Sequence, residues 1–356
     1  MARFTDALRM NARLRRARAR RLTPLLLVPT ALLASVSMLH ATTPAARHRA
    51  RPRSDDPMNV LATALAGLRL FADPAAPAKR AADALRRSRP ADAALLDRIA
   101  AQPTAHWIGG WARDLRREVS GLLDAATAQH AVPVLVAYNI PGRDCGGPSA
   151  GGDRDAESYA HWIREFASGL RGRRAVVVLE PDALGHLDCL APDRQEERVG
   201  MLRDAVGVLK AEGAIVYLDA GNARWVRADP MATRLRRAGL DHADGFALNV
   251  SNFVPTPESV AYGDRLSALV GDKHYILDTS RNGVGGNGEW CNPRGQALGA
   301  FPTTQTGHAR VDAFLWIKAP GQSDGECNGG PAAGSFWTDY ALELGRNQSL
   351  EIAQGR

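Results

Sequence analysis

The stretch Ala175-Val176-Val177-Val178-Leu179-Glu180-Pro181-Asp182 is a short apolar run that ends in carboxylates, and five further segments have the same form. Their apolar parts lie at 132–138, 214–218, 246–248, 275–277 and 313–317, and a carboxylate, an amide or a lysine follows nearly every one. Short apolar runs of this kind are typical of strands that are buried on both faces. In a parallel α/β barrel the residues just past the carboxyl ends of the strands converge on one mouth, where active sites lie. The pattern therefore predicts an enzyme that works through carboxylates.

Amphipathic helical patterns separate these runs, at 155–170, 194–210 and 257–270. Strands that alternate with helices of this length indicate βα units and a parallel sheet. Only six or seven strands can be counted, which is fewer than a complete eight-stranded barrel needs. We therefore expect an α/β fold with an incomplete barrel.

The positive charge of the chain is concentrated at its N-terminus. The 356 residues carry a formal net charge of +7, but residues 1–53 hold 12 arginines and one acid, so the remainder is net negative. The basic pI therefore comes from the N-terminal segment, and a nucleic-acid partner for the folded part is excluded.

Residues 1–46 have the form of an export signal peptide. An Arg-rich stretch up to residue 21 precedes an apolar stretch at 22–39, and small residues follow at 41–46. The apolar core at 25–39 is short for a membrane span, which needs roughly 20 residues, so an uncleaved anchor is the less favoured alternative. We expect a secreted or periplasmic protein without a stable membrane partner.

The rest of the chain is interpreted as one enzyme module. Residues 47–90 are rich in Ala, Arg and Pro and form an N-terminal segment, and residues 91–350 form a single catalytic domain. No internal repeat, linker or second aromatic-rich module is visible. We expect a monomer.

The four cysteines all lie in the part that would be exported: Cys145, Cys189, Cys291 and Cys327. An even number in an exported chain indicates two disulfides, although four cysteines allow three connectivities. The chain has no CxxC or HExxH motif, and its histidines do not cluster at ligand spacing. We therefore expect neither a metal nor another cofactor.

Six motifs carry the chemistry, and they lie at 137–147, 178–184, 217–225, 249–253, 278–293 and 315–325. In this order they resemble glycoside hydrolase family 6, the inverting cellulases, over about residues 95–345. The resemblance implies a distorted, incomplete parallel β/α barrel of about seven strands with the active site at the strand C-terminal ends. It also implies hydrolysis of β-1,4-glucan with inversion of the anomeric centre.

Two carboxylates suit the proton donor that such a reaction needs. A carboxyl group can protonate a leaving oxygen near neutral pH only if burial or a nearby like charge raises its pKa. Asp182 and Asp144 follow neighbouring strands and could form such a pair. By resemblance Asp182 is the general acid, and Asp144 raises its pKa and positions it.

The resemblance assigns two further carboxylates. Asp324 matches the position proposed as general base, and Asp219 matches a site carboxylate that supports substrate binding and charge. Taken singly, each of these residues could equally be a turn or capping residue or half of an ion pair. We interpret Asp278 as structural, with Arg281 as its possible partner.

Aromatic residues are the expected binding groups, because flat sugar faces stack on aromatic rings. Trp225 and Trp290 lie in predicted loops beside motif residues. By resemblance Trp107 lies near the non-reducing side of the cleft, and Tyr138 lies beneath the sugar at the cleavage point. The remaining motif tryptophans are expected in the core: Trp162, Trp316 and Trp337.

Polar side chains in the same motifs are further candidates for substrate binding: Asn222, Asn249, Lys318 and Gln322. Lys318 suits a hydrogen-bond donor to sugar hydroxyls. Relatives usually have Glu at the position of Gln322, so this chain lacks one charge near Asp324.

The resemblance also pairs the cysteines as Cys145–Cys189 and Cys291–Cys327. Each disulfide would constrain an active-site loop, and each would contribute roughly 3–4 kcal/mol in the loop-closure model.

These observations predict a secreted endo-β-1,4-glucanase that acts on a β-glucan polysaccharide. Endo cleavage is favoured because the segments 182–189 and 291–327 are short for a tunnel that encloses a chain end. The alternative is a non-catalytic or weakly active glycan-binding relative, which Gln322 favours and the four retained aspartates oppose. A metal-dependent barrel hydrolase would need histidine ligands at the strand ends, and none is present there.

Overall fold

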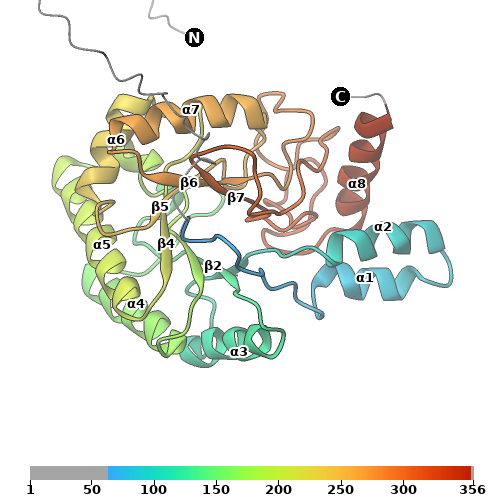
Figure 1. The fold of residues 1–356 in the computed structure, drawn as a ribbon, viewed down its shortest axis with the longest axis horizontal. Helices are drawn as coiled ribbons and strands as arrows, with labels where there is room; N and C mark the ends of the chain where they lie inside the picture. Colours follow the sequence, from blue (N-terminus) through green and yellow to red (C-terminus); the bar gives the residue numbers. More distant parts are fainter. Residues whose placement is uncertain (1–62, 354–356) are drawn as a thin grey trace, which may run out of the picture. The chain divides into compact units, whose positions relative to one another are not determined.

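Seven parallel strands form one sheet in the order β1-β2-β3-β4-β5-β6-β7 (Figure 1). The computed structural model describes residues 63–353, so the predicted signal peptide at 1–46 and the beginning of the 47–90 segment lie outside the described residues. The strands are β1 (His106–Ile108), β2 (Val134–Ala137), β3 (Val176–Leu179), β4 (Ile215–Asp219), β5 (Gly245–Leu248), β6 (His274–Asp278) and β7 (Val311–Leu315). The expected α/β fold with about seven parallel strands is confirmed.

The barrel is incomplete between its first and last strands. Apart from one isolated parallel bridge, Thr104 to Trp316, no pairing connects the β1 and β7 ends in the described part of the chain. The indole Nε1 of Trp107 also crosses this junction and donates to the carbonyl of Ile317 at 2.8 Å. A single bridge and one side chain therefore take the place of a complete eighth strand.

The strands are apolar throughout because both of their faces are buried. Val134, Val136 and Val178 belong to the core inside the barrel. Leu135 and Val177 point the other way and belong to the core between the sheet and the helices. Because side chains alternate along a strand, a strand between two cores needs apolar residues at every position. This requirement explains the continuous apolar runs in the sequence.

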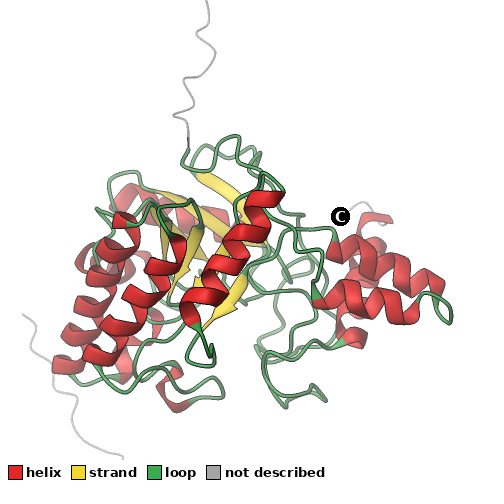
Figure 2. Cartoon of the chain, turned by 90° about the horizontal axis from the view of Figure 1, so that it is seen from below, coloured by secondary structure: helices red, strands yellow, loops and turns green. Residues whose placement is uncertain are grey.

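Five helices cover the outer face of the sheet (Figure 2). They are α3 (Leu115–Ala128), α4 (Ala156–Leu170), α5 (Pro192–Ala211), α6 (Ala228–Arg237) and α7 (Thr256–Leu269). The helical patterns at 155–170, 194–210 and 257–270 correspond to α4, α5 and α7.

A second group of helices packs together away from these five (Figure 1). It consists of α1 (Pro77–Leu85), α2 (Pro90–Ala100) and α8 (Thr338–Ala353), with Trp316 buried among them as expected. Helix α1 lies within the predicted 47–90 segment and α2 begins at residue 90, and the two helices pack on each other. Within residues 63–353 no helix is both long and apolar enough to cross a membrane.

Candidate active site

A cavity of about 1020 Å³ lies at the carboxyl ends of the strands. It is lined by most of the residues that the sequence predicts for the site: Trp107, Tyr138, Asp144, Asp182, Asn222, Trp225, Trp290, Lys318, Gln322 and Asp324. Ser251 and Asn252 also line it, so all six motifs meet in one cleft. Two predicted site residues, Asp219 and Asn249, do not line this cavity.

The backbone turns sharply where β3 ends. Glu180 and Asp182 have φ angles of 50° and 68°, so both adopt the left-handed conformation, and the N–H of Ala183 closes a tight turn onto the carbonyl of Glu180. The residue before a proline usually adopts an extended conformation, but Glu180, which precedes Pro181, does not. Left-handed backbone is costly for residues other than glycine, and such residues concentrate at functional sites. The buried Glu180 carboxylate anchors the turn by accepting from the backbone N–H groups of Asn139 and Ile140 at the end of β2.

Asp182 is surrounded by other carboxylates. Its backbone N–H donates to Asp219 Oδ1 at 2.9 Å. Burial, and then the negative charges of Asp219 and Asp144, raise the pKa of Asp182 well above its ordinary value, and Lys318 opposes this only in part. Asp182 therefore holds a proton at a pH where an exposed aspartate has lost it.

Asp219 acts from beneath the cleft rather than inside it. Its side chain is buried, and Oδ1 also accepts from the N–H of Gly221 at 3.0 Å. Burial raises the pKa of Asp219 to about 7, against the effect of these two N–H donors. Asp219 therefore contacts the backbone of Asp182 and lies outside the lining of the cavity.

Asp144 occupies the loop that follows β2. Oδ2 accepts from the backbone N–H of Ser149 at 2.7 Å, and Oδ1 lies 3.3 Å from His186 Nε2. The adjacent Cys145 forms the disulfide with Cys189, which ties this loop to the turn that carries His186. The Asp144 loop is therefore covalently attached to the segment that follows Asp182.

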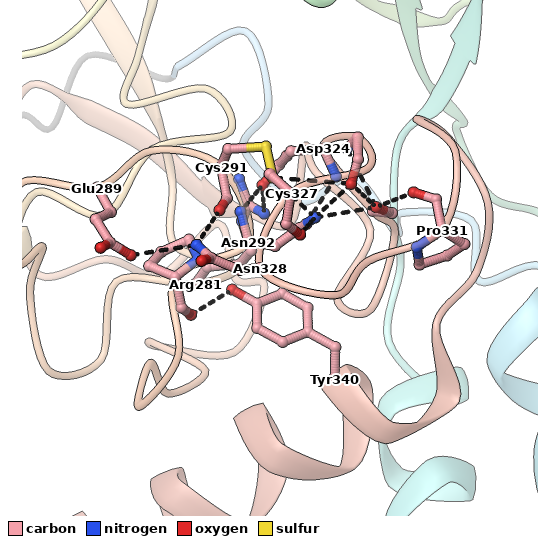
Figure 3. The surroundings of a disulfide bond; sticks show 12 residues. Arg281, Glu289, Cys291, Asn292, Asp324, Cys327, Asn328, Pro331 and Tyr340 are labelled. Carbon is pink, nitrogen blue, oxygen red and sulfur yellow. Dashed lines mark hydrogen bonds and ion pairs between the residues drawn. A yellow bond between two sulfur atoms is a disulfide. The ribbon is translucent and has the colours of Figure 1, made fainter.

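Asp324 lies in a different environment, which Figure 3 shows. Oδ2 accepts from Arg281 Nη1 at 2.7 Å and from the N–H of Asn292 at 3.0 Å, and Oδ1 lies 3.1 Å from Lys318 Nζ. Burial works against ionisation, but Arg281 and Lys318 outweigh it and lower the pKa of Asp324 to about 2. Asp324 is therefore an ionised carboxylate at any physiological pH.

The aromatic side chains form the walls of the cleft. Trp225 and Trp290 are 38% and 52% exposed, as sugar-stacking residues need to be. Trp225 lies so close to Gly185 that a Cβ there would meet the indole at 2.6 Å, and this close approach requires glycine. The ring of Tyr138 contacts Trp107 edge-on, with the centroids 5.0 Å apart.

The structure does not support two of the expected interactions. Asn249 is wholly buried, and its amide donates to the carbonyls of Val254 and Asp278, so its assignment as a substrate-binding residue is wrong. Asp278 is structural as expected, but it accepts backbone N–H groups, including those of Ser251 and Lys318, and forms no ion pair with Arg281.

Lys318 and Gln322 line the cleft but also have partners within the protein. Lys318 forms the ion pair with Asp324, and Gln322 Nε2 donates to the carbonyl of Gly334 at 3.3 Å. Both predicted disulfides, Cys145–Cys189 and Cys291–Cys327, are confirmed. Within the described residues no cluster of His, Cys, Asp and Glu could hold a metal ion.

Four residues of the site were not predicted from the sequence. Arg281 was considered only as a partner of Asp278, and His186 carried no motif signal. Trp111 is 54% exposed and lines the cleft, and the repeated tryptophan of the segment 106–111 could have indicated it. Arg143 lies over the Tyr138 ring at 4.2 Å, and only its place beside Asp144 could have indicated this role.

Comparison with known proteins agrees with this geometry. The model of glycosyl hydrolases family 6 matches residues 65–348. The chain is 49% identical over 259 residues to endoglucanase A of Cellulomonas fimi, which covers 72% of this chain and 57% of that protein. It is 45% identical over 287 residues to endoglucanase 1 of Streptomyces halstedii, which covers 77% of this chain and 87% of that protein. The chain therefore spans little more than half the length of the first of these relatives.

A solved structure with the same fold extends the comparison. The endoglucanase Cel6 of Mycobacterium tuberculosis, in complex with methyl-cellobiosyl-4-deoxy-4-thio-β-D-cellobioside, aligns with a TM-score of 0.76 and 44% sequence identity. The alignment covers 80% of this chain and 99% of the Mycobacterium tuberculosis chain.

Proposed function

The chain belongs to glycosyl hydrolase family 6, and we propose on this basis that it is an endo-β-1,4-glucanase. It hydrolyses internal β-1,4 bonds of cellulose or a related β-glucan and inverts the anomeric configuration. The endoglucanase names of the relatives at 45% and 49% identity support the endo mode of cleavage.

One observation carries the proposed chemistry, namely that a half-buried aspartate, Asp182, and a buried aspartate, Asp324, line the same cleft with opposite protonation. Carboxylates and burial raise the pKa of Asp182, whereas Arg281 and Lys318 lower the pKa of Asp324 to about 2. An inverting glycosidase needs a protonated acid on one side of the scissile bond and an ionised base on the other. Pairs whose environments separate their pKa values identify such roles.

The proposed reaction follows from these two states. Asp182 donates its proton to the glycosidic oxygen as the bond from that oxygen to the anomeric carbon breaks. A water molecule attacks the anomeric carbon from the opposite face, and its proton passes to Asp324. The product carries the α configuration at the new reducing end, because attack and departure occur on opposite faces.

The same proposal covers substrate binding and location. Three tryptophans that line the cleft stack on glucose units of the substrate: Trp107, Trp225 and Trp290. A flat indole ring provides a large contact area for the face of a sugar. Export to an oxidising compartment is supported by the two disulfides, which persist outside the reducing cytosol. The signal peptide at 1–46 and the monomeric state stay predictions.

The test compares the native protein with its Asp182→Ala variant on carboxymethyl cellulose. Reducing ends and viscosity are followed together, and the anomer released from cellotetraose is followed by NMR. For the native protein we expect viscosity to fall early while few reducing ends appear, and we expect the α-anomer to be released. The Asp182→Ala variant should neither lower the viscosity nor release sugar. An Asp193→Ala variant serves as a control, because Asp193 is an exposed carboxylate on α5 outside the cleft.

Two results would overturn the proposal. Release of cellobiose with little early loss of viscosity would replace endo cleavage by cleavage from a chain end. Binding of cellotetraose without release of sugar from the native protein would favour the glycan-binding alternative.

A further inference from the structure

His186 connects the proton-donor group of the cleft with an aromatic wall. Its Nε2 lies 3.3 Å from Asp144 Oδ1, and its ring contacts Trp225 edge-on with the centroids 4.6 Å apart. All three side chains line the cleft. The reaction described above gives His186 no role.

The turn that carries His186 is held on several sides. It belongs to the short helix η2 (Gly185–Cys189), whose last residue is joined by a disulfide to Cys145, the neighbour of Asp144. From α6, the Arg234 guanidinium donates to the carbonyls of Leu184 and Gly185. The backbone that carries His186 is therefore fixed relative to Asp144 by covalent and hydrogen-bonded contacts.

The charges around His186 define which atom carries the hydrogen. The groups that face it are Asp144 and, from α5, Arg198, while Arg234 lies behind its turn. An ionised carboxylate only accepts hydrogen bonds, so Nε2 must be the protonated nitrogen and must donate to Asp144. This donation is the same whether the imidazole is neutral or charged.

We propose that His186 is a positioning residue for the reaction: it donates to Asp144 and keeps that carboxylate ionised and oriented beside the acid, Asp182. This inference rests on the proposed function. The productive form has Asp144 ionised and Asp182 protonated, because the charge of Asp144 helps to hold the proton on Asp182 and favours the positive charge that develops on the sugar.

The proposal predicts an effect on one side of the pH profile only. Without the donor, the ionised form of Asp144 is less favourable, so the productive form is lost at a higher pH during acidification. Loss of a hydrogen bond to a partly exposed charge should move the acidic limb of kcat upward by about half to one pH unit. The alkaline limb reports the proton on Asp182 and should stay in place, because Asp144 is ionised both before and after that proton leaves.

Two variants separate the donor from the ring. His186→Phe keeps an aromatic ring against Trp225 but removes the donor, whereas His186→Gln removes the ring and keeps an amide N–H near the position of Nε2. The native protein and both variants are assayed on carboxymethyl cellulose across the pH range, with circular dichroism and cellotetraose binding as checks of folding. His161→Gln is the control, because His161 is an exposed histidine on α4.

We expect the acidic limb to move in His186→Phe and to remain near its native position in His186→Gln and His161→Gln. An unmoved acidic limb in His186→Phe, or an equal movement in both His186 variants, would overturn the inference while the proposed function stands. If His186→Phe folds poorly, the test depends on His186→Gln, and a displaced acidic limb in that variant would contradict the inference. An inactive native protein would refute the proposed function itself.

Discussion

The two halves of the cleft use the same residue type in opposite ways. On the acid side, Asp144, Asp182 and Asp219 crowd together, and burial with like charge raises the pKa of Asp182. On the base side, Asp324 lies between Arg281 and Lys318, and these cations lower its pKa to about 2. Both Asp219 and Asp324 are buried, so burial does not account for the difference. The partner charges decide which carboxyl group holds a proton.

Each side of the cleft also has its own disulfide. Cys145–Cys189 connects the loops that carry Asp144 and His186, and Cys291–Cys327 encloses Asn292 and Asp324. Like charges on the acid side repel one another, whereas the base side holds a cluster of paired charges. A covalent connection restrains the loops in both cases.

The largest expected effect is on the acid side. Replacing Asp182 by Asn keeps its shape but removes the proton donor, and loss of general acid catalysis should lower hydrolysis of β-glucan about 10²- to 10⁴-fold. A dinitrophenyl β-cellotrioside has a leaving group that needs no proton, so its hydrolysis should fall far less. Steady-state rates on both substrates provide the measurement, and an equal loss on both would show that Asp182 is not the acid.

The next effect is on the base side and concerns stability. Arg281→Met leaves the buried Asp324 with only part of its partner charge, and breaking a buried ion pair should cost about 3–5 kcal/mol of unfolding free energy. The matched control is Arg224→Met, which breaks the exposed pair with Glu258 and should cost under about 1 kcal/mol. Denaturant unfolding of both variants gives the comparison, and similar losses would mean that the Arg281 pair contributes no more than a surface pair.

The sequence predicted most of the acid side because strand ends are visible in it. Apolar runs end at 138, 179 and 218, and the residues that follow include Asp144, Asp182 and Asp219. In a parallel sheet these ends must meet, so adjacency along the sheet becomes adjacency in space. The sequence could not show that Asp219 lies beneath the cleft, because side-chain depth depends on the tight turns after each strand.

The base side was less accessible to prediction because its contacts join distant segments. Arg281 follows β6, whereas Asp324 lies in the loop after β7. Both residues lie in long irregular segments, which have no periodic hydrophobic pattern from which their contact could be predicted. Proximity in sequence instead favoured Asp278 as the partner of Arg281. Strand β1 lacked a signal for a related reason, because only three residues belong to it. Helices α3 and α6 were missed although their buried residues recur every three or four positions, as the helical period requires.

A somewhat smaller effect should appear when the buried, titrating carboxyl group of the acid side is replaced by an amide. The pKa of Asp219 is raised from 3.8 to about 7, so the folded protein holds this proton more tightly than the unfolded chain does. The stability that Asp219 contributes is therefore present at low pH and is lost as the pH rises toward and through about 7. Asp219→Asn does not titrate, so its stability relative to the native protein should improve by roughly 3–4 kcal/mol between pH 4 and pH 8.

Unfolding free energies of the native protein and Asp219→Asn at the two pH values measure this change. In Asp219→Asn the amide nitrogen would replace Oδ2, which has no hydrogen-bond partner in the native protein. Any loss of stability from this replacement is the same at both pH values, so it cancels when the two differences are compared. If the difference in unfolding free energy between the two proteins does not change with pH, Asp219 is ionised throughout this range. The acid side would then hold an ionised buried aspartate, as the base side does.

The smallest effect should follow Gln322→Glu, which adds a carboxylate to the base side. Arg281 and Lys318 already outnumber Asp324 there, so the new charge offsets a surplus of positive charge instead of adding to a cluster of like charges. Asp324 should stay ionised, and the acidic limb of kcat should move by less than about 0.3 pH unit, with the shift screened by salt. Profiles at low and high ionic strength measure it, and the exposed Gln305→Glu substitution controls for the added charge alone. A shift approaching one pH unit would show that the two cations do not hold Asp324 as firmly as the geometry indicates.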